Sequence, residues 1–481
     1  MKKNISLSIL KLEGKEIPEF LRKYKEDIEK IEKLKIDVNK FSYLVHFDVM
    51  DNKFVQNNGV DLKYIKTAKN LGLYVDTHLM VENPIGDKYI EQAIEFGTDD
   101  ITIHYEINNF EGILNYLNEK KEYLKRKFNR NLNIGVSIKP KTEVKVLEKF
   151  KDRFSKILIM SVEPGFGGQE YLEKTNEKIK EAVRLFPKHT IQVDGGINFN
   201  TLENVLSEKV ESIVMGSYLT NNYNSTLLCK MQMLEMLKSI EELPKDRNIE
   251  FDKKILQIVK GGYGENDILK GISVPNIRKI ANKWYKVITK ESLVPFISSK
   301  YHEYRQFACI ILSNLVKKEL KLKDEEKRKH QVINIISFFE DNLKYINNWD
   351  LTDEVATNIL GSYLILLKDK DTKKELDKYL KNDIMWVRRI GILSTLTYVK
   401  KGYKELPFYA CKKELYSKEP LINKAVGWVL REIYKKHPLE LKEFLKENND
   451  KKTLPKFVMS YATEKMTKEE KEYVKNIKEW N

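Results

Sequence analysis

Eight short runs rich in β-branched and aromatic residues, each followed by a polar, helix-forming stretch, dominate the first 220 residues. Such alternation is typical of parallel strands joined by helices. Eight units in about 200 residues predict a (β/α)8 TIM barrel, and an open doubly wound sheet is the alternative. The runs are SLSIL (6–10), LVHFDVM (44–50), YVDTHLMV (74–81), DITIHYE (100–106), IGVSI (134–138), ILIMSVE (157–163), IQVDGGI (191–197) and SIVMGSYL (212–219), with a final helix expected over 226–240.

The character of the chain changes after EELPKDRN (241–248), where amphipathic helical patterns replace the β-rich runs. A chain of 481 residues is also too long for one hydrophobic core. We therefore expect a multidomain protein with domains at 1–242 and 243–481. In the second, tryptophans at 349, 386 and 428 are 37 and 42 residues apart. This spacing is close to the period of about 40 typical of stacked helical repeats, whose concave wall is a natural binding surface.

The positive charge is concentrated in the second domain. Residues 1–240 hold 37 Lys and Arg against 35 Asp and Glu, a net charge of +2, which leaves +13 of the total +15 for residues 241–481. This asymmetry indicates a polyanionic partner, and the alternative is a lysine-rich chain that places lysines on every solvated helix face.

The cysteines and the hydropathy pattern indicate the compartment. Cys229, Cys309 and Cys411 are scattered, which argues against a disulfide scaffold or a zinc ribbon and fits a reducing environment. No run of about 18 apolar residues exists. We therefore expect a cytoplasmic protein without a membrane partner.

Four side chains with metal-binding chemistry occur at predicted strand ends. His46 and Asp48 lie two residues apart on one strand, so their side chains share a face. His78 ends the next strand and Asp194 ends the seventh. The carboxyl ends of barrel strands meet at one mouth, so these four residues predict a site for Zn2+, Fe2+ or Mn2+. Any one histidine alone could be a hydrogen-bonded core residue.

Three glycine-rich segments follow the sixth, seventh and eighth strands: EPGFGGQ (163–169), DGGI (194–197) and GS (216–217). Glycines let backbone N–H groups close around an anion, and the last strands of a barrel usually supply its phosphate site. Together they predict that a sugar phosphate binds at this mouth.

These motifs resemble those of the ribulose-phosphate 3-epimerase family. The family pattern of Ser-Ile-Leu, His-x-Asp-Val-Met-Asp, Asp-x-His-Leu-Met-Val, Pro-Gly-Phe-Gly-Gly-Gln and Asp-Gly-Gly-Ile is found here as SIL, HFDVMD, DTHLMV, PGFGGQ and DGGI. The resemblance implies one divalent metal ion on the four residues above. It also implies epimerisation at C3 of a ketose phosphate, D-ribulose 5-phosphate to D-xylulose 5-phosphate, with Asp48 and Asp194 as acid and base on opposite faces of the sugar. Inversion beside a carbonyl needs two proton shuttles, which explains the pair of carboxylates.

The same resemblance implies which residues contact the substrate. Met50, Met80 and Met160 match methionines beside the reacting carbon, and a core-filling role is the alternative. The full substrate-binding set is Ser8, Met50, Met80, Met160, Gly165, Phe166, Gly167, Gly168, Gly195, Gly196, Gly216 and Ser217.

Several positions depart from the family pattern. The usual Met-Asp-Gly is Met50-Asp51-Asn52, and the usual Val-Asn-Pro is Val162-Glu163-Pro164. The loop after the first strand is also atypical. A hexulose 6-phosphate therefore stays open as the substrate. Homo-oligomers through the barrel are expected by analogy.

The second domain resembles the HEAT-like-repeat DNA glycosylases of alkylation repair. The blocks that carry this resemblance are VPNIRKIA (274–281), YRQFA (304–308), NNWDLTD (347–353), MWVRRIGIL (385–393), KAVGWVLREIYKKHP (424–438) and YATEK (461–465). It implies excision of N-alkylated purines, such as 3-methyladenine and 7-methylguanine, from double-stranded DNA without a cofactor. Asp353 is the expected catalytic residue. The expected DNA- and lesion-binding residues are Trp349, Arg388 (favoured) or Arg389, Trp428 and Arg431.

The residue types fit that chemistry. A carboxylate can stabilise an oxocarbenium-like sugar, tryptophan faces attract a cationic base, and arginines hold phosphates. The alternative is a helical repeat that binds DNA or protein without catalysis, with the tryptophans in its core and Asp353 paired to Arg388 or Arg389. We expect Asp350 to be structural, as a helix N-cap for instance, and Glu354 to be solvated.

Overall fold

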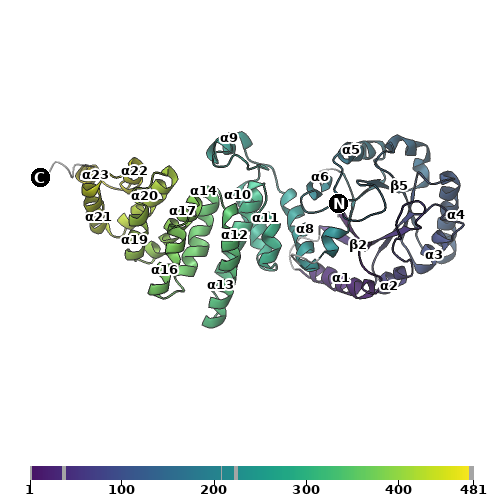
Figure 1. The fold of residues 1–481 in the computed structure, drawn as a ribbon, viewed down its shortest axis with the longest axis horizontal. Helices are drawn as coiled ribbons and strands as arrows, with labels where there is room; N and C mark the ends of the chain where they lie inside the picture. The colour runs from purple at the N-terminus through teal and green to yellow at the C-terminus, as the bar shows by residue number, and fades with distance from the viewer. Residues whose placement is uncertain (1–2, 35–39, 207–208, 222–225, 476–481) are drawn as a thin grey trace. The chain divides into compact units, whose positions relative to one another are not determined.

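The computed structural model describes residues 3–34, 40–206, 209–221 and 226–475. The chain divides into two compact units, Met1–Glu241 and Glu242–Asn481. All strands of the described residues lie in the first unit, and the described part of the second consists of helices and loops (Figure 1). No helix within the described ranges has the length and apolar character needed to cross a bilayer.

The first unit is a closed barrel of eight parallel strands in the order β1 to β8, so the open sheet is excluded and the predicted barrel is confirmed. The strands are β1 (Lys3–Ser8), β2 (Phe41–Met50), β3 (Val75–Met80), β4 (Asp100–His104), β5 (Asn133–Ile138), β6 (Lys156–Met160), β7 (Thr190–Asp194) and β8 (Ser212–Met215). The helices are α1 (Ile17–Glu32), α2 (Tyr64–Asn70), α3 (Tyr89–Phe96), α4 (Phe110–Phe128), η1 (Val144–Arg153), α5 (Thr175–Leu185), α6 (Leu202–Leu206), α7 (Ser217–Thr220) and α8 (Leu227–Glu241).

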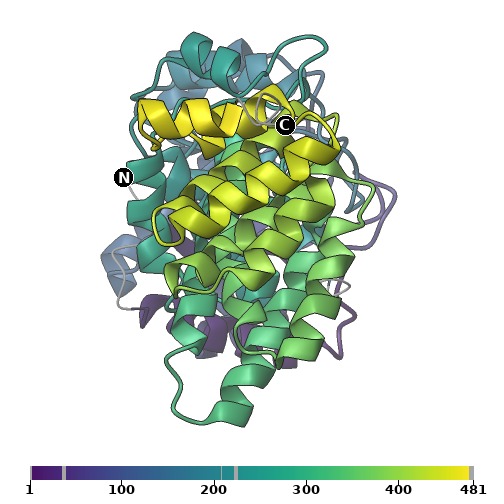
Figure 2. The same ribbon diagram turned by 90° about the vertical axis from the view of Figure 1, so that its left-hand side faces the viewer.

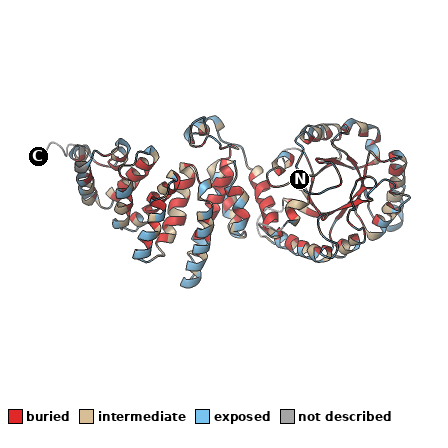
Figure 3. Ribbon diagram, in the orientation of Figure 1, coloured by how far each residue is buried: buried red, intermediate tan, exposed pale blue. Residues whose placement is uncertain are grey.

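The strands are buried along nearly their whole length because helices cover them on the outside (Figure 3). This burial explains why the runs read as nearly continuous apolar segments with few polar interruptions. The last helix, α8, also pins the start of β2. The Glu235 carboxylate accepts hydrogen bonds from the backbone N–H groups of Lys40 and Phe41, at 2.8 and 3.3 Å, and from the Tyr43 hydroxyl at 3.0 Å.

The second unit is built from paired helices, as the helical-repeat prediction requires. The helices α10, α12, α14, α17, α20 and α22 pack on one another in that order (Figure 1), and Figure 2 views this unit from its C-terminal end. The bounds are α9 (Ile249–Ile255), α10 (Val274–Trp284), η2 (Lys290–Leu293), α11 (Val294–Ile297), α12 (His302–Glu319), α13 (Glu325–Asp341), η3 (Leu343–Tyr345), α14 (Trp349–Val355), η4 (Ala356–Gly361), α15 (Ser362–Leu364), α16 (Asp369–Leu380), α17 (Met385–Ser394), α18 (Leu396–Lys400), α19 (Glu405–Glu414), α20 (Pro420–Tyr434), α21 (Pro438–Lys451), α22 (Lys456–Ala462) and α23 (Lys468–Lys475).

The tryptophan spacing does not mark equivalent positions of a repeat. Trp349 is the first residue of α14 and Trp386 the second of α17, whereas Trp428 lies in the middle of α20. Trp386 is buried and its ring meets that of Tyr263 edge to face, with centroids 5.3 Å apart. Trp349 and Trp428 are half-buried. Of the three, only these two are therefore available to a ligand of this unit.

Candidate active sites of the two units

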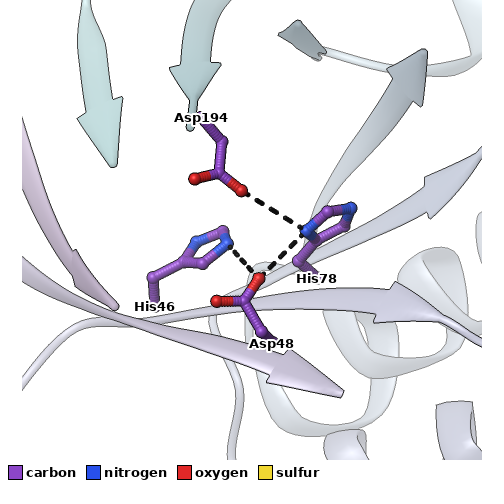
Figure 4. Close-up of side chains that lie close together, drawn as sticks. All are labelled: His46, Asp48, His78 and Asp194. Carbon is purple, nitrogen blue, oxygen red and sulfur yellow. Dashed lines mark hydrogen bonds and ion pairs between the residues drawn. The ribbon is translucent and has the colours of Figure 1, made fainter. Parts of the chain in front are cut away.

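The strand register brings the four predicted ligands to the carboxyl ends of the barrel strands. Alternation along β2 turns His46 and Asp48 to the same face. The pairing of β2 with β3 places Asp48 opposite His78. Asp194 is the last residue of β7. The side chains converge from three strands, as Figure 4 shows.

The distances within this group are short. His46 Nε2 and His78 Nδ1 each lie 3.3 Å from Asp48 Oδ1, and His78 Nδ1 lies 3.9 Å from Asp194 Oδ2. One nitrogen or oxygen atom from each of the four residues lies within 4.8 Å of those from the other three. His46 and His78 are fully buried.

A second layer of hydrogen bonds fixes both imidazoles from behind. His46 Nδ1 donates to Asp76 Oδ2 at 2.9 Å, and Asp76 also accepts from the buried Lys156 ammonium. His78 Nε2 contacts His104 Nε2 at 2.9 Å. His104 Nδ1 in turn lies 3.1 Å from Glu106 Oε2. Carboxylates behind a ligating histidine set its tautomer and its orientation, so each imidazole is held with one nitrogen facing the group.

Burial and close charges separate the protonation states of the four groups. Burial and the nearby Asp48 carboxylate raise the pKa of Asp194 to about 7. Burial also raises the pKa of Asp48, but His46 and His78 outweigh this and hold it well below its usual range. Burial lowers the pKa of His78 to about 4. Burial acts in the same direction on His46, but Asp48 and Asp76 outweigh it there and raise the pKa.

The four residues fit a divalent metal ion. His46 Nε2 is buried without a hydrogen-bond partner although it points at the carboxylates, and a buried unpaired nitrogen is costly. A metal ion would satisfy it and would offset the repulsion between Asp48 and Asp194. Two imidazoles with two carboxylates suit Zn2+, Fe2+ or Mn2+.

A pocket of about 300 Å3 opens beside this group. Asp48 and Asp194 line it at the metal-binding end, and Ser8 Oγ donates to Asp48 Oδ2 at 2.7 Å. Every predicted substrate-binding residue lines the same pocket, namely Ser8, Met50, Met80, Met160, Gly165, Phe166, Gly167, Gly168, Gly195, Gly196, Gly216 and Ser217. The structure therefore brings the whole predicted set together at one mouth.

The glycines in this pocket are required by the backbone. Gly168 and Gly196 have φ of +87° and +66°, a region that other residues rarely adopt. A Cβ on Gly196 would also lie 2.4 Å from the backbone nitrogen of Tyr171. Glycine at these positions therefore allows the turns with which the two loops line the pocket.

Three residues of the site escaped the sequence analysis. His104 ends β4 and Glu106 lies in the turn after it. Their two-residue spacing in DITIHYE repeats that of His46 and Asp48 in HFD, so a signal was available. Lys11, in the loop after β1, also lines the pocket.

In the second unit the predicted catalytic carboxylate is already paired. Arg389 donates to both oxygens of Asp353, with the closest contact from Nη2 to Oδ1 at 2.8 Å. Arg389 Nη1 also donates to the Leu421 carbonyl at 2.7 Å. Burial raises the pKa of Asp353, and Arg389 offsets part of that rise.

Arg388, which the sequence favoured, points elsewhere. Its Nη1 donates to the carbonyls of Asn382 and Asp383, at 2.9 and 3.0 Å, and its Nε lies 3.4 Å from Glu414. Consecutive helical residues point about 100° apart, so only one of the two arginines can reach Asp353. Arg389, and not Arg388, occupies that position.

A pocket of about 520 Å3 adjoins Asp353. Trp428 and Arg431 line it, as the shared helix face predicts. Arg431 forms ion pairs with Glu464 and with Glu432, the latter at 3.4 Å. The rest of the lining is mixed apolar, polar and charged: Thr357, Leu393, Leu396, Val399, Lys400, Glu432, Lys435 and Lys436.

The segment that begins α14 is fixed by buried polar contacts. Asp350 Oδ2 accepts from His302 Nε2 at 2.8 Å and from Gln306 Nε2 at 3.0 Å. The Asn348 side chain, and not that of Asp350, accepts from the backbone nitrogen of Trp349 at 2.8 Å. Glu354, expected to be solvated, has a largely buried side chain that pairs with Arg278. Asp350 is thus tied into the helix packing, whereas Asp353 faces the pocket.

Comparison with known proteins separates the same two units. The ribulose-phosphate 3-epimerase family model matches residues 17–220, and the model of the DNA alkylation repair enzymes matches residues 239–466. Among solved structures, the predicted DNA alkylation repair enzyme from Enterococcus faecalis aligns over 47% of this chain and 99% of its own, at 21% identity and a TM-score of 0.35. An alignment of that quality adds nothing to the match with the family model.

Among curated relatives, the ribulose-phosphate 3-epimerases of Aquifex aeolicus and Bacillus subtilis are each 32% identical over 179 residues. Those alignments cover 36% of this chain and 76% and 77% of the two relatives. Through its first unit the chain therefore belongs to the ribulose-phosphate 3-epimerase family, and its second unit matches the DNA alkylation repair enzymes.

Proposed function

We propose that the barrel, as a domain of residues 1–242, epimerises D-ribulose 5-phosphate and D-xylulose 5-phosphate at C3. The observation in favour of this proposal is that Asp48 and Asp194 line one pocket from β2 and β7, which are separated by β8 and β1 in the barrel. A ketose between them would meet a carboxylate on each face, as inversion requires.

The residues of the chain divide the work. His46, Asp48, His78 and Asp194 would hold the metal ion, which supplies a Lewis acid that acidifies the C–H beside the carbonyl. One aspartate removes the C3 proton and the other delivers a proton to the opposite face. Ser8 orients Asp48 through its 2.7 Å hydrogen bond. Met50, Met80 and Met160 line the wall and exclude water from the reacting carbon.

The test is interconversion of the two pentose phosphates by the intact chain, loaded in turn with Zn2+, Fe2+ or Mn2+. We expect turnover that a chelator or His46→Ala abolishes. Undiminished turnover after metal removal would contradict the metal site. If a hexulose 6-phosphate is turned over with higher kcat/KM than the pentose, the alternative substrate replaces the proposed one.

For residues 243–481 we propose a DNA glycosylase that releases N-alkylated purines from duplex DNA. The observation in its favour is that Asp353, Trp428 and Arg431 line one pocket, and that three lysines line it against the single glutamate Glu432. A cationic base could stack on the indole while the carboxylate faces the sugar. Basic side chains around the pocket would hold the phosphates.

The rival is a repeat that binds DNA without catalysis, and the Asp353–Arg389 ion pair is what that rival predicts. Release of 3-methyladenine and 7-methylguanine from methylated DNA separates the two. We expect release by the intact protein and its loss in Asp353→Asn, with DNA affinity retained. Equal release by wild type and Asp353→Asn would leave only the binding function.

A further inference from the structure

Lys11 reaches the glycine loop of the barrel pocket from the other side of the mouth. It lies in the loop between β1 and α1, and its aliphatic chain runs along Gly167 and Gly168. A Cβ on Gly167 would lie 3.2 Å from Lys11 Cε, and a Cβ on Gly168 would lie 2.4 Å from Lys11 Nζ. The ammonium group therefore lies directly against Gly168, in space that a side chain at this position would share with it.

The ammonium also lies beside the eighth-strand contribution to the pocket. Ser217 Oγ is 3.4 Å from the same Cβ position on Gly168 that Lys11 Nζ approaches. Gly216 and Ser217 follow β8 and begin α7. Lys11 Nζ thus lies beside both the loop after β6 and the residues that follow β8, all of which line the pocket.

Lys11 differs in the sign of its charge from the other charged residues of the pocket. Among the described residues that line it, Lys11 has the only cationic side chain, whereas Asp48, Glu163 and Asp194 are acidic. Lys11 is exposed, and no acidic side chain within the described ranges pairs with it. The metal ion would offset the charge of Asp48 and Asp194, but Glu163 beside the glycine loop would still repel a phosphate dianion.

We propose that Lys11 binds the substrate phosphate as a side-chain cation and completes, from the β1 side, a cradle otherwise made of backbone groups. This inference rests on the proposed function because it assigns the phosphate end of the same pocket. Lys11 lies in the loop after the first strand, where this sequence departs from the family pattern. The ligand class is a phosphomonoester dianion, for which a lysine acts as a point charge.

The experiment compares the intact chain with Lys11→Met, Lys11→Arg and the control Lys15→Met. Lys15 lies in the same loop but is 81% exposed and pairs with Glu13. Two readouts are measured: the Kd of inorganic phosphate by calorimetry, and KM and kcat for ribulose 5-phosphate. A hydrogen bond to a charged group is worth about 1.5–3 kcal/mol, or roughly 10- to 100-fold in affinity.

We expect Lys11→Met to weaken phosphate binding and raise KM by about 10- to 100-fold, with kcat changed less than about threefold. Lys11→Arg should restore most of the loss, and Lys15→Met should match wild type. If Lys11→Met binds phosphate as tightly as wild type, the inference is overturned, whatever its kcat. If the wild-type chain shows no epimerisation but binds phosphate, and Lys11→Met loses that binding, the proposed function fails and the role of Lys11 stands.

Discussion

The two units differ in what surrounds the carboxylates that line their pockets. In the barrel, Asp48 and Asp194 face each other and two histidines, and His46 Nε2 stays unpaired. In the helical unit, Asp353 is held by the guanidinium of Arg389. The barrel group could hold a cation from solution, whereas the helical carboxylate is paired with a cation of its own chain. The first arrangement indicates function by itself, and the second is equally compatible with a structural role.

The largest expected effect follows from removing one barrel carboxylate. Asp194→Asn keeps the shape but leaves a proton shuttle on one face only, so we expect kcat to fall by roughly 10²–10⁴-fold. In D2O the variant should still exchange the C3 hydrogen of one epimer through Asp48. The exposed Asp61→Asn serves as the control. Interconversion above a tenth of the wild-type rate would show that Asp194 is not a shuttle.

The second prediction tests the internal pairing in the helical unit. Arg389→Met leaves the half-buried Asp353 without its cation and should destabilise this unit by about 1–3 kcal/mol. Adding Asp353→Asn should recover part of the loss, because the unpaired charge is then gone. Denaturant unfolding followed by tryptophan fluorescence measures the stability of this unit, because all five tryptophans lie between residues 284 and 480. Arg388→Met as destabilising as Arg389→Met would contradict the assignment.

The third prediction concerns pH and sharpens the contrast within the helical unit. Burial lowers the pKa of His302, but Asp350 and Asp267 outweigh burial and the nearby Arg305 and raise it to about 9. The stabilisation by the imidazolium is therefore complete below the ordinary pKa of 6.5 and is lost as the pH rises through about 9. We expect a loss of up to about 3 kcal/mol in unfolding free energy over that window.

The matched variants for that prediction are His302→Gln, which should flatten the profile, and the exposed His330→Gln, which should leave it unchanged. An unfolding free energy of the wild type that stays constant from pH 6.5 to 9.5 would rule out stabilisation by a protonated His302.

The smallest expected effect lies behind the barrel metal site. In Glu106→Gln an amide N–H donates to His104 Nδ1, so the ring proton of His104 moves to its Nε2. His104 Nε2 can then no longer accept a hydrogen bond from His78 Nε2. This mismatch should weaken metal affinity by roughly 10- to 100-fold. Competition with a coloured chelator measures the affinity, with the exposed Glu119→Gln as control. Unchanged affinity would mean that the His104–Glu106 pair does not tune His78.

Local patterns were sufficient to predict much of the molecule. Buried strands read as short apolar runs, and the two-residue spacing of His46 and Asp48 was enough to place both side chains on one face of β2. Residue types near strand ends then predicted the pocket, since the carboxyl ends of barrel strands share one mouth. These inferences depend only on the strand period and the barrel closure.

Other features depend on packing between distant segments. Whether Arg388 or Arg389 meets Asp353 is decided by the rotation of α17 against α14 and α20, which adjacent positions in a sequence do not reveal. Likewise, the reach of Lys11 to Gly168 depends on the path of a loop more than 150 residues away along the chain. Flexible side chains and loop paths leave no periodic signal.

The hydrogen bonds between Glu235 of α8 and the start of β2 have a consequence for the order in which the barrel forms during synthesis. Glu235 completes the backbone hydrogen bonds at Lys40 and Phe41 across separations of 195 and 194 residues. Closing so long a loop is slow, and a ribosome adds residues at about 5–20 per second. The start of β2 should therefore wait about 10–40 seconds for its last partner. An emerging chain passes through that interval with a strand edge that chaperones could recognise.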